Sequence, residues 1–342
     1  GALGEPLYLD VVAALKDSKF GGVKVFSGRY GLGSKDTTPA QIVAVYENTA
    51  KEKFTIGIVD DVTNLSLETG APIVTTPEGT TNCKFWGLGA DGTVGANKNS
   101  IKIIGDNTDM YAQAYFDYDS KKSGGVTMSH LRFGKKPIKS TYLIHKANFV
   151  ACHNPSYVNK YNMVQELVDG GTFLLNCAWD MEGLEKHLPG QVKAFIANHN
   201  IKFYTIDGVK IGIETGMGPT RINTILQSAF FKLTGIIPED QAIDLMKAAA
   251  KATYGRKGDD VVQKNWAAID AGAKQVVEIQ VPESWKNAED EGLHMTHATE
   301  GRQDVIDFVN NIQAKVNAQE GNSLPVSAFK DYVDGTTPSG SA

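Results

Sequence analysis

Three glycines in the stretch KFWGLGADGTVGANKNSIKI, residues 84–103, follow a phosphate-binding pattern. Gly87, Gly89 and Gly92 lie between an apolar run that predicts a strand and a polar run that predicts a helix, which is the context in which a G-x-G-x-x-G loop binds phosphate. Glycine lets the backbone approach a pyrophosphate closely, and the N–H groups at the helix start carry about half a positive charge toward it. The pattern predicts a nucleotide site, although tight turns use glycine in the same way.

A lysine pair follows the next predicted strand. The segment YAQAYFDYDSKKSGG ends in Lys121, Lys122 and two glycines, and the carboxyl end of the second strand of a doubly wound sheet lies beside the nucleotide ribose. An NAD site would carry an acidic residue near this place, whereas two ammonium groups suit a phosphate on the ribose. NADP carries that phosphate at the 2′ position and coenzyme A at the 3′ position, so both stay open. A solvated turn is the third interpretation.

Asn176 is a further candidate for ligand binding. It ends the apolar run TFLLN, and ligands of open parallel sheets gather at the carboxyl ends of the strands. An Asn that is buried and hydrogen-bonded within the protein is an equally good interpretation.

The cysteines do not form a recognisable cluster or nucleophile site. Cys83, Cys152 and Cys177 are widely spaced, whereas an iron–sulfur centre needs about four thiolates in tight local spacing. We therefore expect buried structural thiols. His153 directly follows Cys152, and adjacent side chains rarely face each other as base and nucleophile. We expect no catalytic group and no metal site in this segment.

Composition excludes several classes of function. The 342 residues carry a net charge of −5 with a pI near 5.8, which argues against a nucleic-acid-binding protein because phosphate contacts need a basic face. No apolar run approaches the ~18–20 residues of a membrane span, and no secretory leader opens the chain, so we expect a cytoplasmic protein. The opening GALGEP lacks an initiator Met and the closing GTTPSGSA has linker composition, which predicts a segment of a longer polypeptide.

The apolar pattern predicts an α/β fold with two modules. In residues 1–75, a strand in KVFSG, a helix that begins at Pro39 behind a Thr37 or Thr38 cap, and a strand at 54–59 form a strand–helix–strand unit. This order predicts a small parallel sheet.

Residues 76–281 continue the alternation as a second, larger module. After the glycine loop and its helix, we predict a strand from Tyr111, strands within 140–154, 172–179 and 202–207, and helices at 163–170, 184–200 (interrupted at Pro189), from Pro219 and Thr220, 238–255 and 258–279. Residues 282–342 are predicted to be a peripheral extension and linker.

These segments resemble the central region of pyruvate:ferredoxin (flavodoxin) oxidoreductase. The resemblance is carried by FWGLGADGTVGANKNSIKIIGD, YAQAYFDYDSKKSGGVTMSHLRFG, HNPSYVNKYN and IGIETGMGPTRINTILQSAFF, and in the first module by GRYGLGSKDTTPAQIVAVY and FTIGIVDDVTNLSL. It implies the C-terminal part of a transketolase C-terminal-like domain at 1–75, a Rossmann-like γ-type module at 76–281, and an extension at 282–342 toward a ferredoxin-like domain.

The resemblance implies an enzyme that converts pyruvate, coenzyme A and oxidised ferredoxin or flavodoxin into acetyl-CoA, carbon dioxide and reduced carrier. Members of the family are cytoplasmic and usually homodimeric. They use thiamine diphosphate, Mg²⁺ and 4Fe–4S clusters, and the modules that hold these groups have no counterpart in this segment.

Within this segment the resemblance implies a share in coenzyme A binding. Carried across residue by residue, the pyrophosphate region would be held by Gly89, Asp91, Gly92, Thr93, Val94, Asn97 and Lys98, and the ribose phosphate by Lys121 and Lys122. The segment by itself is expected to show no turnover. An NADP-dependent reductase with the same glycine loop and a structural spacer that binds no nucleotide are the two alternatives.

Overall fold

The structure of the chain is a computed structural model that describes residues 4–119, 124–289, 293, 295 and 297–341. The chain separates into two compact units. Unit 1 comprises Gly1–Thr75, Ser140–Tyr142 and Met295–Ala342, and unit 2 comprises Thr76–Lys139 and Leu143–His294. Of the residues 282–342 that the sequence predicts to be an extension, only Met295–Ala342 are grouped with the first 75 residues. The residues before them belong to unit 2, and Trp285 is buried in one of its cores.

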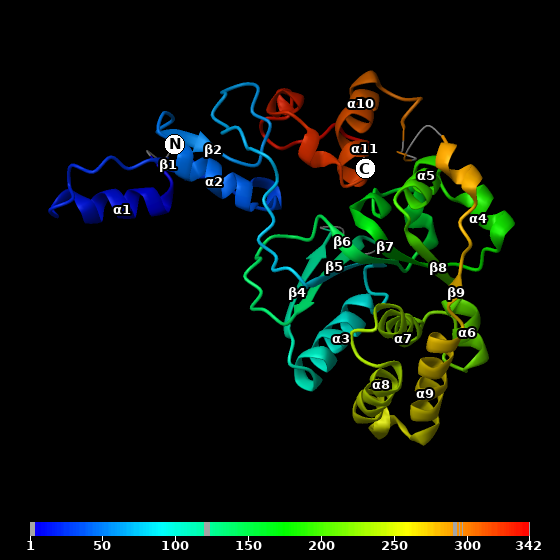
Figure 1. Ribbon diagram of the computed structural model, residues 1–342. Coiled ribbons are helices and arrows are strands. Elements are labelled where there is room, and N and C mark those ends of the chain that lie inside the picture. Colours follow the sequence, from blue (N-terminus) through cyan, green and yellow to red (C-terminus); the bar gives the residue numbers. More distant parts are fainter. Residues whose placement is uncertain (1–3, 120–123, 290–292, 294, 296, 342) are drawn as a thin grey trace. The chain divides into compact units, whose positions relative to one another are not determined.

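Unit 2 is built on a seven-stranded sheet (Figure 1). Its strands are β3 Thr81–Leu88, β4 Tyr111–Tyr118, β5 Val126–Gly134, β6 Ala147–Cys152, β7 Leu167–Asn176, β8 Lys202–Ile206 and β9 Val277–Glu278. They lie in the order β4–β5–β3–β6–β7–β8–β9. The run β3–β6–β7–β8 is parallel, and β5 and β9 are antiparallel to their neighbours. Four adjacent strands therefore end at one edge.

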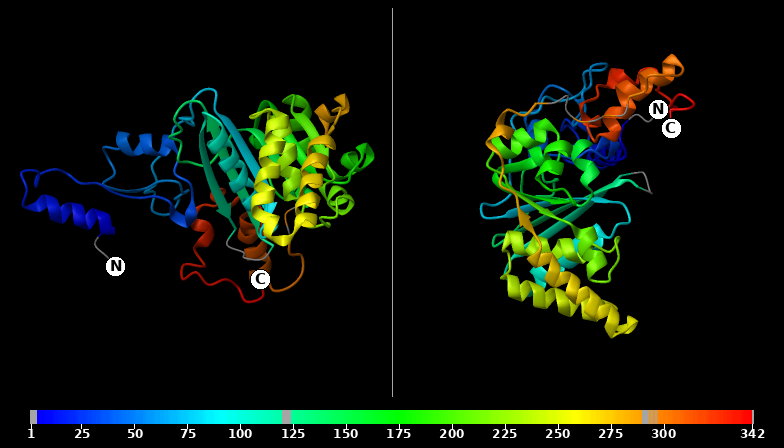
Figure 2. Two further views of the ribbon diagram at one scale, coloured as in Figure 1. Left: turned by 90° about the horizontal axis from the view of Figure 1, so that it is seen from below. Right: turned by 90° about the vertical axis from the view of Figure 1, so that its right-hand side faces the viewer.

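Helices cover both faces of this sheet (Figure 2). One face packs against α3 Thr93–Asn107, α7 Asn223–Thr234, α8 Glu239–Tyr254 and α9 Asp259–Lys274, and the other against α4 Met181–His187 and α5 Gly190–Asn198. The short α6 Gly208–Glu214 follows β8. Successive strand residues alternate between the two cores, as Phe85 and Trp86 do in β3. This three-layer arrangement confirms the predicted α/β fold class.

β5 was not predicted, and it separates two strands that the sequence places side by side. It pairs antiparallel with β3 on one side and β4 on the other. The carboxyl ends of β3 and β4 still point the same way because two antiparallel steps restore the direction. All nine β5 residues are buried, including Thr127, Ser129, His130 and Arg132, so the strand has neither the apolar run nor the polar alternation that usually reveals one.

Three other predictions are wrong in unit 2. The helix predicted at 258–279 ends as α9 at Lys274, and β9 Val277–Glu278 follows it. The predicted helix at 163–170 is a 3₁₀ turn, Val164–Glu166, followed at once by β7. Pairing of Leu167 with Ala147 of β6 extends the chain there, which shows tertiary pairing overriding a weak local helix pattern. The helix predicted from Pro219 begins instead at Asn223, because the preceding residues form a turn after α6.

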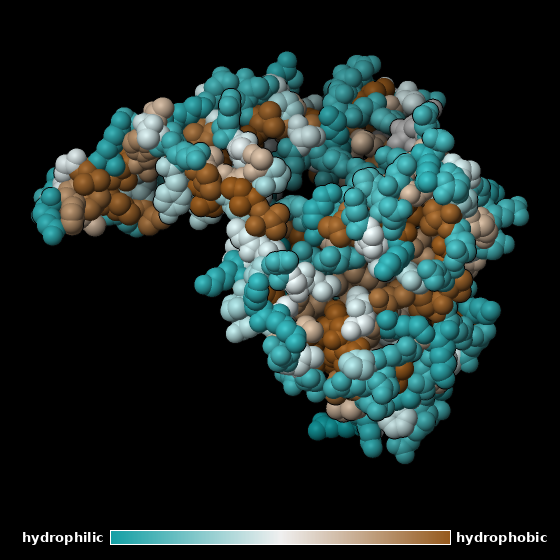
Figure 3. Space-filling view, in the orientation of Figure 1, coloured by the Kyte–Doolittle hydropathy of each residue, from teal (hydrophilic) through white to brown (hydrophobic). Residues whose placement is uncertain are grey.

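Unit 1 contains a two-stranded parallel sheet, β1 Ser27–Arg29 with β2 Lys53–Thr55. Both strands are shorter and less buried than predicted. Between them, α2 Pro39–Glu47 starts at Thr38, whose hydroxyl accepts from Gln41 N while the Gln41 side chain accepts from Thr38 N. This capping box confirms the predicted helix start. α1 Pro6–Lys16 buries no residue and exposes Leu7, Leu9, Val11 and Val12 (Figure 3).

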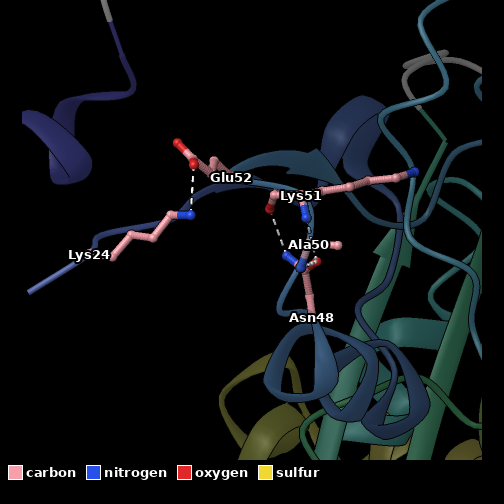
Figure 4. A network of polar contacts seen from close by, with 5 residues as sticks. All are labelled: Lys24, Asn48, Ala50, Lys51 and Glu52. Carbon is pink, nitrogen blue, oxygen red and sulfur yellow. Dashed lines mark hydrogen bonds and ion pairs between the residues drawn. The ribbon is translucent and has the colours of Figure 1, made fainter.

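The turn after α2 is held by a local polar network (Figure 4). The Asn48 side chain accepts from the backbone N–H groups of Ala50 and Lys51 and donates to the carbonyl of Lys51. Lys24 pairs with Glu52 at 2.7 Å. These contacts stabilise the turn that connects α2 to β2.

The C-terminal residues fold back onto the first 75 residues inside unit 1. α10 Gln303–Phe308 and α11 Ala314–Asn317 frame a small core of Phe308, Ile312 and Leu324. Val326 N donates to Val59 O at 2.9 Å, and Ser327 donates to the Asp61 carboxylate through its backbone N–H and its hydroxyl. No helix within the described residues has the length and apolar character needed to cross a membrane.

Replacing Gly272 with Ala is expected to destabilise unit 2 by about 2 kcal/mol, because α9 crosses α7 there at close range. A Cβ atom at position 272 would lie 2.9 Å from Cα of Ile225 and closer still to its carbonyl oxygen. The matched control is Gly95→Ala in α3, where a Cβ would meet nothing within 4 Å; it should stabilise by about 0.5–1 kcal/mol.

Urea unfolding followed by tryptophan fluorescence measures both variants. The chain's 4 tryptophans, Trp86, Trp179, Trp266 and Trp285, all belong to unit 2, so the signal reports that unit alone. Equal effects of the two substitutions would contradict the close α7–α9 crossing.

Candidate functional site

The glycine loop joins β3 to α3 at the carboxyl end of the strand. β3 ends at Leu88, and α3 begins at Thr93 directly after Gly92, whose φ of 88° lies in the left-handed region. A side chain at Gly92 would be strained and would collide with Nδ2 of Asn223. The turn itself therefore requires this glycine.

The other two glycines permit close packing. A Cβ atom at Gly87 would lie 2.5 Å from Oγ1 of Thr93, and one at Gly89 would lie 3.1 Å from the carbonyl oxygen of Gly125. The Gly89 N–H donates to that same oxygen at 2.7 Å. Bare backbone at these positions brings α3 against β3 and the loop against the start of β5.

Asp91 organises the loop from within. Its carboxylate accepts from the backbone N–H of Leu88 at 2.8 Å and from that of Thr93 at 2.7 Å. Asn223, the first residue of α7, donates its side-chain amide to the Asp91 carbonyl. An acidic side chain at a helix start satisfies N–H groups that have no partner in the helix. Both carboxylate oxygens are thus used to hold the loop.

A buried histidine lies directly under the loop. Oγ1 of Thr93 and Nδ1 of His153 are hydrogen-bonded at 2.8 Å. Burial lowers the pKa of His153 to about 4, although the negative charge of Asp91 opposes this shift. The imidazole is therefore neutral at physiological pH.

A cavity of about 450 Å³ lies between the glycine loop and the β4–β5 hairpin. Its lining residues are Leu88, Gly89, Ala90, Asp91, Gly92, Val94, Tyr118, Asp119, Gly125, Val126 and Thr127. The volume falls within the ~300–1,000 Å³ of small-molecule sites. Tyr118 is exposed, and the buried Thr127 hydroxyl has no hydrogen-bond partner in the described part of the chain. The cavity combines apolar walls with few polar groups.

Lys98 supplies a cation on α3. Nζ of Lys98, in the second turn of α3, lies 5.4 Å from the ring centre of Phe116 in β4. Lys121 and Lys122 lie outside the described residues. The residues on either side of their segment, Asp119 and Gly125, line the cavity.

The structure brings most of the sequence-predicted residues to one place. Gly89, Asp91, Gly92 and Val94 line the cavity. Thr93 and Asn97 are buried beneath the loop and helix, and Lys98 is exposed on the same helix.

Asn176 lies apart from the cavity lining. Its side-chain amide donates to the carbonyl of His153 at 2.9 Å, and its side-chain oxygen accepts from the N–H of Gly208 at 2.9 Å. The structure therefore matches the alternative interpretation, a buried Asn that is hydrogen-bonded within the protein.

Sequence reasoning missed Tyr118 and Thr127 as lining residues and His153 as a partner of the loop. An aromatic residue that ends a strand beside the lysine pair was the available signal for Tyr118. Nothing local distinguishes Thr127 or His153, because their neighbours in the site come from other strands.

The cysteines take no part in this site. Cys83, Cys152 and Cys177 are buried free thiols, and burial raises the pKa of each. Sγ of Cys152 donates to Asn154 O at 3.0 Å, whereas His153 pairs with Thr93, so they do not act on each other. Among the described residues, no group of three or more His, Cys, Asp or Glu side chains is placed to hold a metal ion.

Comparison with known families shows to which family the chain belongs. Residues 82–275 match the family described as pyruvate ferredoxin/flavodoxin oxidoreductase. The chain belongs to this family. The match spans the strands from β3 to β8, the glycine loop and the helices α3 to α9, and it confirms the resemblance drawn from the sequence. Residues 296–342 match a second family, EKR, described as a domain of unknown function.

Family members of known name are similar along the whole chain. A pyruvate:ferredoxin oxidoreductase of Moorella thermoacetica is 52% identical over 99% of this chain and 28% of its own length. A pyruvate-flavodoxin oxidoreductase of Enterobacter agglomerans is 51% identical over 100% of the chain and 29% of its own. A pyruvate dehydrogenase [NADP(+)] of Cryptosporidium parvum is 46% identical over 99% of the chain and 19% of its own length. The chain thus spans less than a third of each relative.

A solved structure is similar to part of the chain. The pyruvate oxidoreductase subunit PORC of Thermotoga maritima matches 59% of this chain and 100% of its own, with a TM-score of 0.48 and 17% identity.

Proposed function

We propose that this chain is the coenzyme A-binding segment of a pyruvate:ferredoxin/flavodoxin oxidoreductase. The observation that carries the proposal is the family match over residues 82–275, which contains the strand–glycine loop–helix unit and its cavity. The complete enzyme would convert pyruvate, coenzyme A and oxidised carrier to acetyl-CoA, carbon dioxide and reduced carrier, as a cytoplasmic homodimer. Its partners would be the remaining domains and ferredoxin or flavodoxin.

The described residues do not fit the other cofactors of that reaction. Thiamine diphosphate would supply the carbanion and 4Fe–4S clusters would carry the electrons. The three cysteines are separate and buried, and the described residues include no metal-binding group of side chains. The share of this chain is to bind and orient coenzyme A, which turns a bimolecular encounter into an oriented one.

The charges near the cavity support a nucleotide whose phosphates lie at its rim. The Thr93 N–H already donates to Asp91, so the remaining first-turn N–H groups of the 15-residue helix α3 are the ones that favour an anion at the glycine loop. Lys98 adds a cation on the same helix. Asp91 and Asp119 line the cavity itself, and two carboxylates disfavour a phosphate there. We therefore propose that the pyrophosphate lies at the rim and not inside the cavity, against backbone N–H groups of the segment Gly89–Lys98 and the Lys98 ammonium group. We propose that the 3′-phosphate binds Lys121 and Lys122.

The relatives do not tie this segment to NADP as its nucleotide. A relative named for ferredoxin is 52% identical to this chain, and a relative named for NADP(+) is 46% identical. This chain covers 28% of the length of the first relative and 19% of the length of the second. The additional length of the NADP(+) proteins lies outside the part that matches. A change of electron acceptor therefore accompanies sequence beyond this segment.

Replacing Lys121 and Lys122 together with Ala is expected to abolish the preference of the enzyme for coenzyme A over dephospho-coenzyme A. Loss of charge-assisted contacts to the 3′-phosphate should weaken coenzyme A binding by about 10- to 100-fold and leave dephospho-coenzyme A unchanged. Titration calorimetry with coenzyme A, dephospho-coenzyme A and NADPH measures this. The matched control is Lys135→Ala with Lys136→Ala, a second lysine pair at the opposite end of β5.

The same titration separates the alternatives. Tighter binding of NADPH than of coenzyme A would favour the reductase, and no binding of any nucleotide would favour the structural spacer. Dye reduction that depends on pyruvate and coenzyme A should require the complete enzyme. Sustained reduction by this chain alone would contradict its assignment as a binding segment.

A further inference from the structure

A chain of hydrogen bonds runs along the carboxyl edge of the sheet beneath the glycine loop. It links Thr93 to His153 at 2.8 Å, Asn176 to the carbonyl of His153 at 2.9 Å, and the N–H of Gly208 to Asn176 at 2.9 Å. These residues follow or end β3, β6, β7 and β8, the four adjacent parallel strands. We infer that His153 and Asn176 are positioning residues that hold the glycine loop in its ligand-binding conformation, an inference that rests on the proposed function.

Thr93 connects this series of hydrogen bonds to the glycine loop. It is fully buried and fits a notch that exists because Gly87 has no side chain, since a Cβ there would lie 2.5 Å from Thr93 Oγ1. Its backbone N–H donates to the Asp91 carboxylate at 2.7 Å. Fixing the Thr93 side chain therefore fixes Asp91 and the first turn of α3 together.

His153 suits a structural contact rather than proton transfer. His153 is 8% exposed and is absent from the cavity lining. The centres of the Phe85 and His153 rings lie 6.2 Å apart, and the two rings are nearly perpendicular. A neutral imidazole has one donor and one acceptor nitrogen, and a hydroxyl can serve either. Its own backbone N–H donates to Trp86 O at 2.9 Å, so the main chain of His153 is held by β3 while its ring is held by Thr93.

Asn176 holds His153 from the other side. Each end of its side-chain amide has a backbone partner, one after β6 and one at the start of α6, and the residue is 5% exposed. Both polar atoms of the side chain bind backbone, and Asn176 is absent from the cavity lining. Asn176 therefore affects binding through His153.

The test uses the full-length enzyme and two substitutions of His153. His153→Leu removes the nitrogen that pairs with Thr93, and His153→Asn restores a polar group near the Nδ1 position. We expect His153→Leu to raise the Kd and KM for coenzyme A about 10-fold and to leave the KM for pyruvate within about two-fold. His153→Asn should recover most of the affinity. Thr108→Val, which removes a hydroxyl hydrogen bond at the opposite end of α3, is the matched control.

A double-substitution cycle tests whether His153 acts through Thr93. Thr93→Val combined with His153→Leu should weaken coenzyme A binding no more than the stronger single substitution, because both break one bond. Additive losses would overturn the inference, as would a fall in kcat with unchanged KM values, which indicates lost active protein.

The outcome also distinguishes this inference from the proposed function. Wild-type enzyme that binds coenzyme A with the 3′-phosphate preference, together with unchanged binding by His153→Leu, would overturn the positioning role alone. Wild-type enzyme that fails to bind coenzyme A would overturn both.

Discussion

Replacing Glu166 with Gln is expected to lower the free energy of unfolding of unit 2 by about 3–5 kcal/mol, because it leaves a buried ammonium group without a counter-charge. Nζ of Lys84 lies 2.5 Å from Oε1 of Glu166, and the two side chains are 6% and 20% exposed. Lys84 Nζ also lies 4.9 Å from the ring centre of Trp86. Burial raises the pKa of Glu166, although Lys84 opposes this shift. Urea unfolding followed by tryptophan fluorescence measures the loss.

The double variant Lys84→Met with Glu166→Leu should recover most of that stability, because an apolar pair of similar volume avoids the desolvation of two charges. Asp109→Asn is the control, since its partner Lys135 is 3.8 Å away and both side chains are largely exposed; it should change stability by less than about 1 kcal/mol. A Glu166→Gln effect as small as that of the control would contradict a buried ion pair.

Lowering the pH from about 6.5 to about 4.5 should cost wild-type unit 2 roughly 2 kcal/mol through His153 alone, since each pKa unit is worth 1.36 kcal/mol. Burial lowers the pKa of His153 from 6.5 to about 4. Between these values the unfolded chain binds a proton that the folded chain excludes. The stabilising contribution is therefore present above pH 6.5 and is lost as the pH falls toward 4.

Urea unfolding of wild type and His153→Asn across this pH range isolates the effect from that of the carboxylates, which titrate in both proteins. On acidification, the free energy of unfolding of the variant should fall by roughly 2 kcal/mol less than that of the wild type. Parallel pH profiles would show that His153 is accessible to protons in the folded state.

The sequence predicted the order of strands and helices around the glycine loop because the signals there are local. An apolar run ends in three spaced glycines, and a helix follows. The Thr38 cap before Pro39 is equally local, and the structure contains it. By contrast, β5 is buried on both faces although it carries Ser129, His130 and Arg132. Only its position between β3 and β4 makes those polar residues part of a core.

The candidate site divides in the same way. Gly89, Asp91 and Gly92 were found from their spacing, and they line a cavity. The contact of Thr93 with His153 joins residues 60 positions apart, and no local pattern announces it. The placement of Asn176 depended on its burial, which composition does not reveal.

By itself, the sequence determined the family, the α/β alternation and the strand–glycine loop–helix pattern, because these depend on residue type and on spacing over a few turns of chain. Only the tertiary structure decided that β5 enters between β3 and β4, that the glycines accommodate Thr93 and Gly125, and that a neutral His153 supports the loop. The physical reason is that burial and hydrogen bonding between strands depend on which distant segments become neighbours, and that is set when the whole sheet assembles.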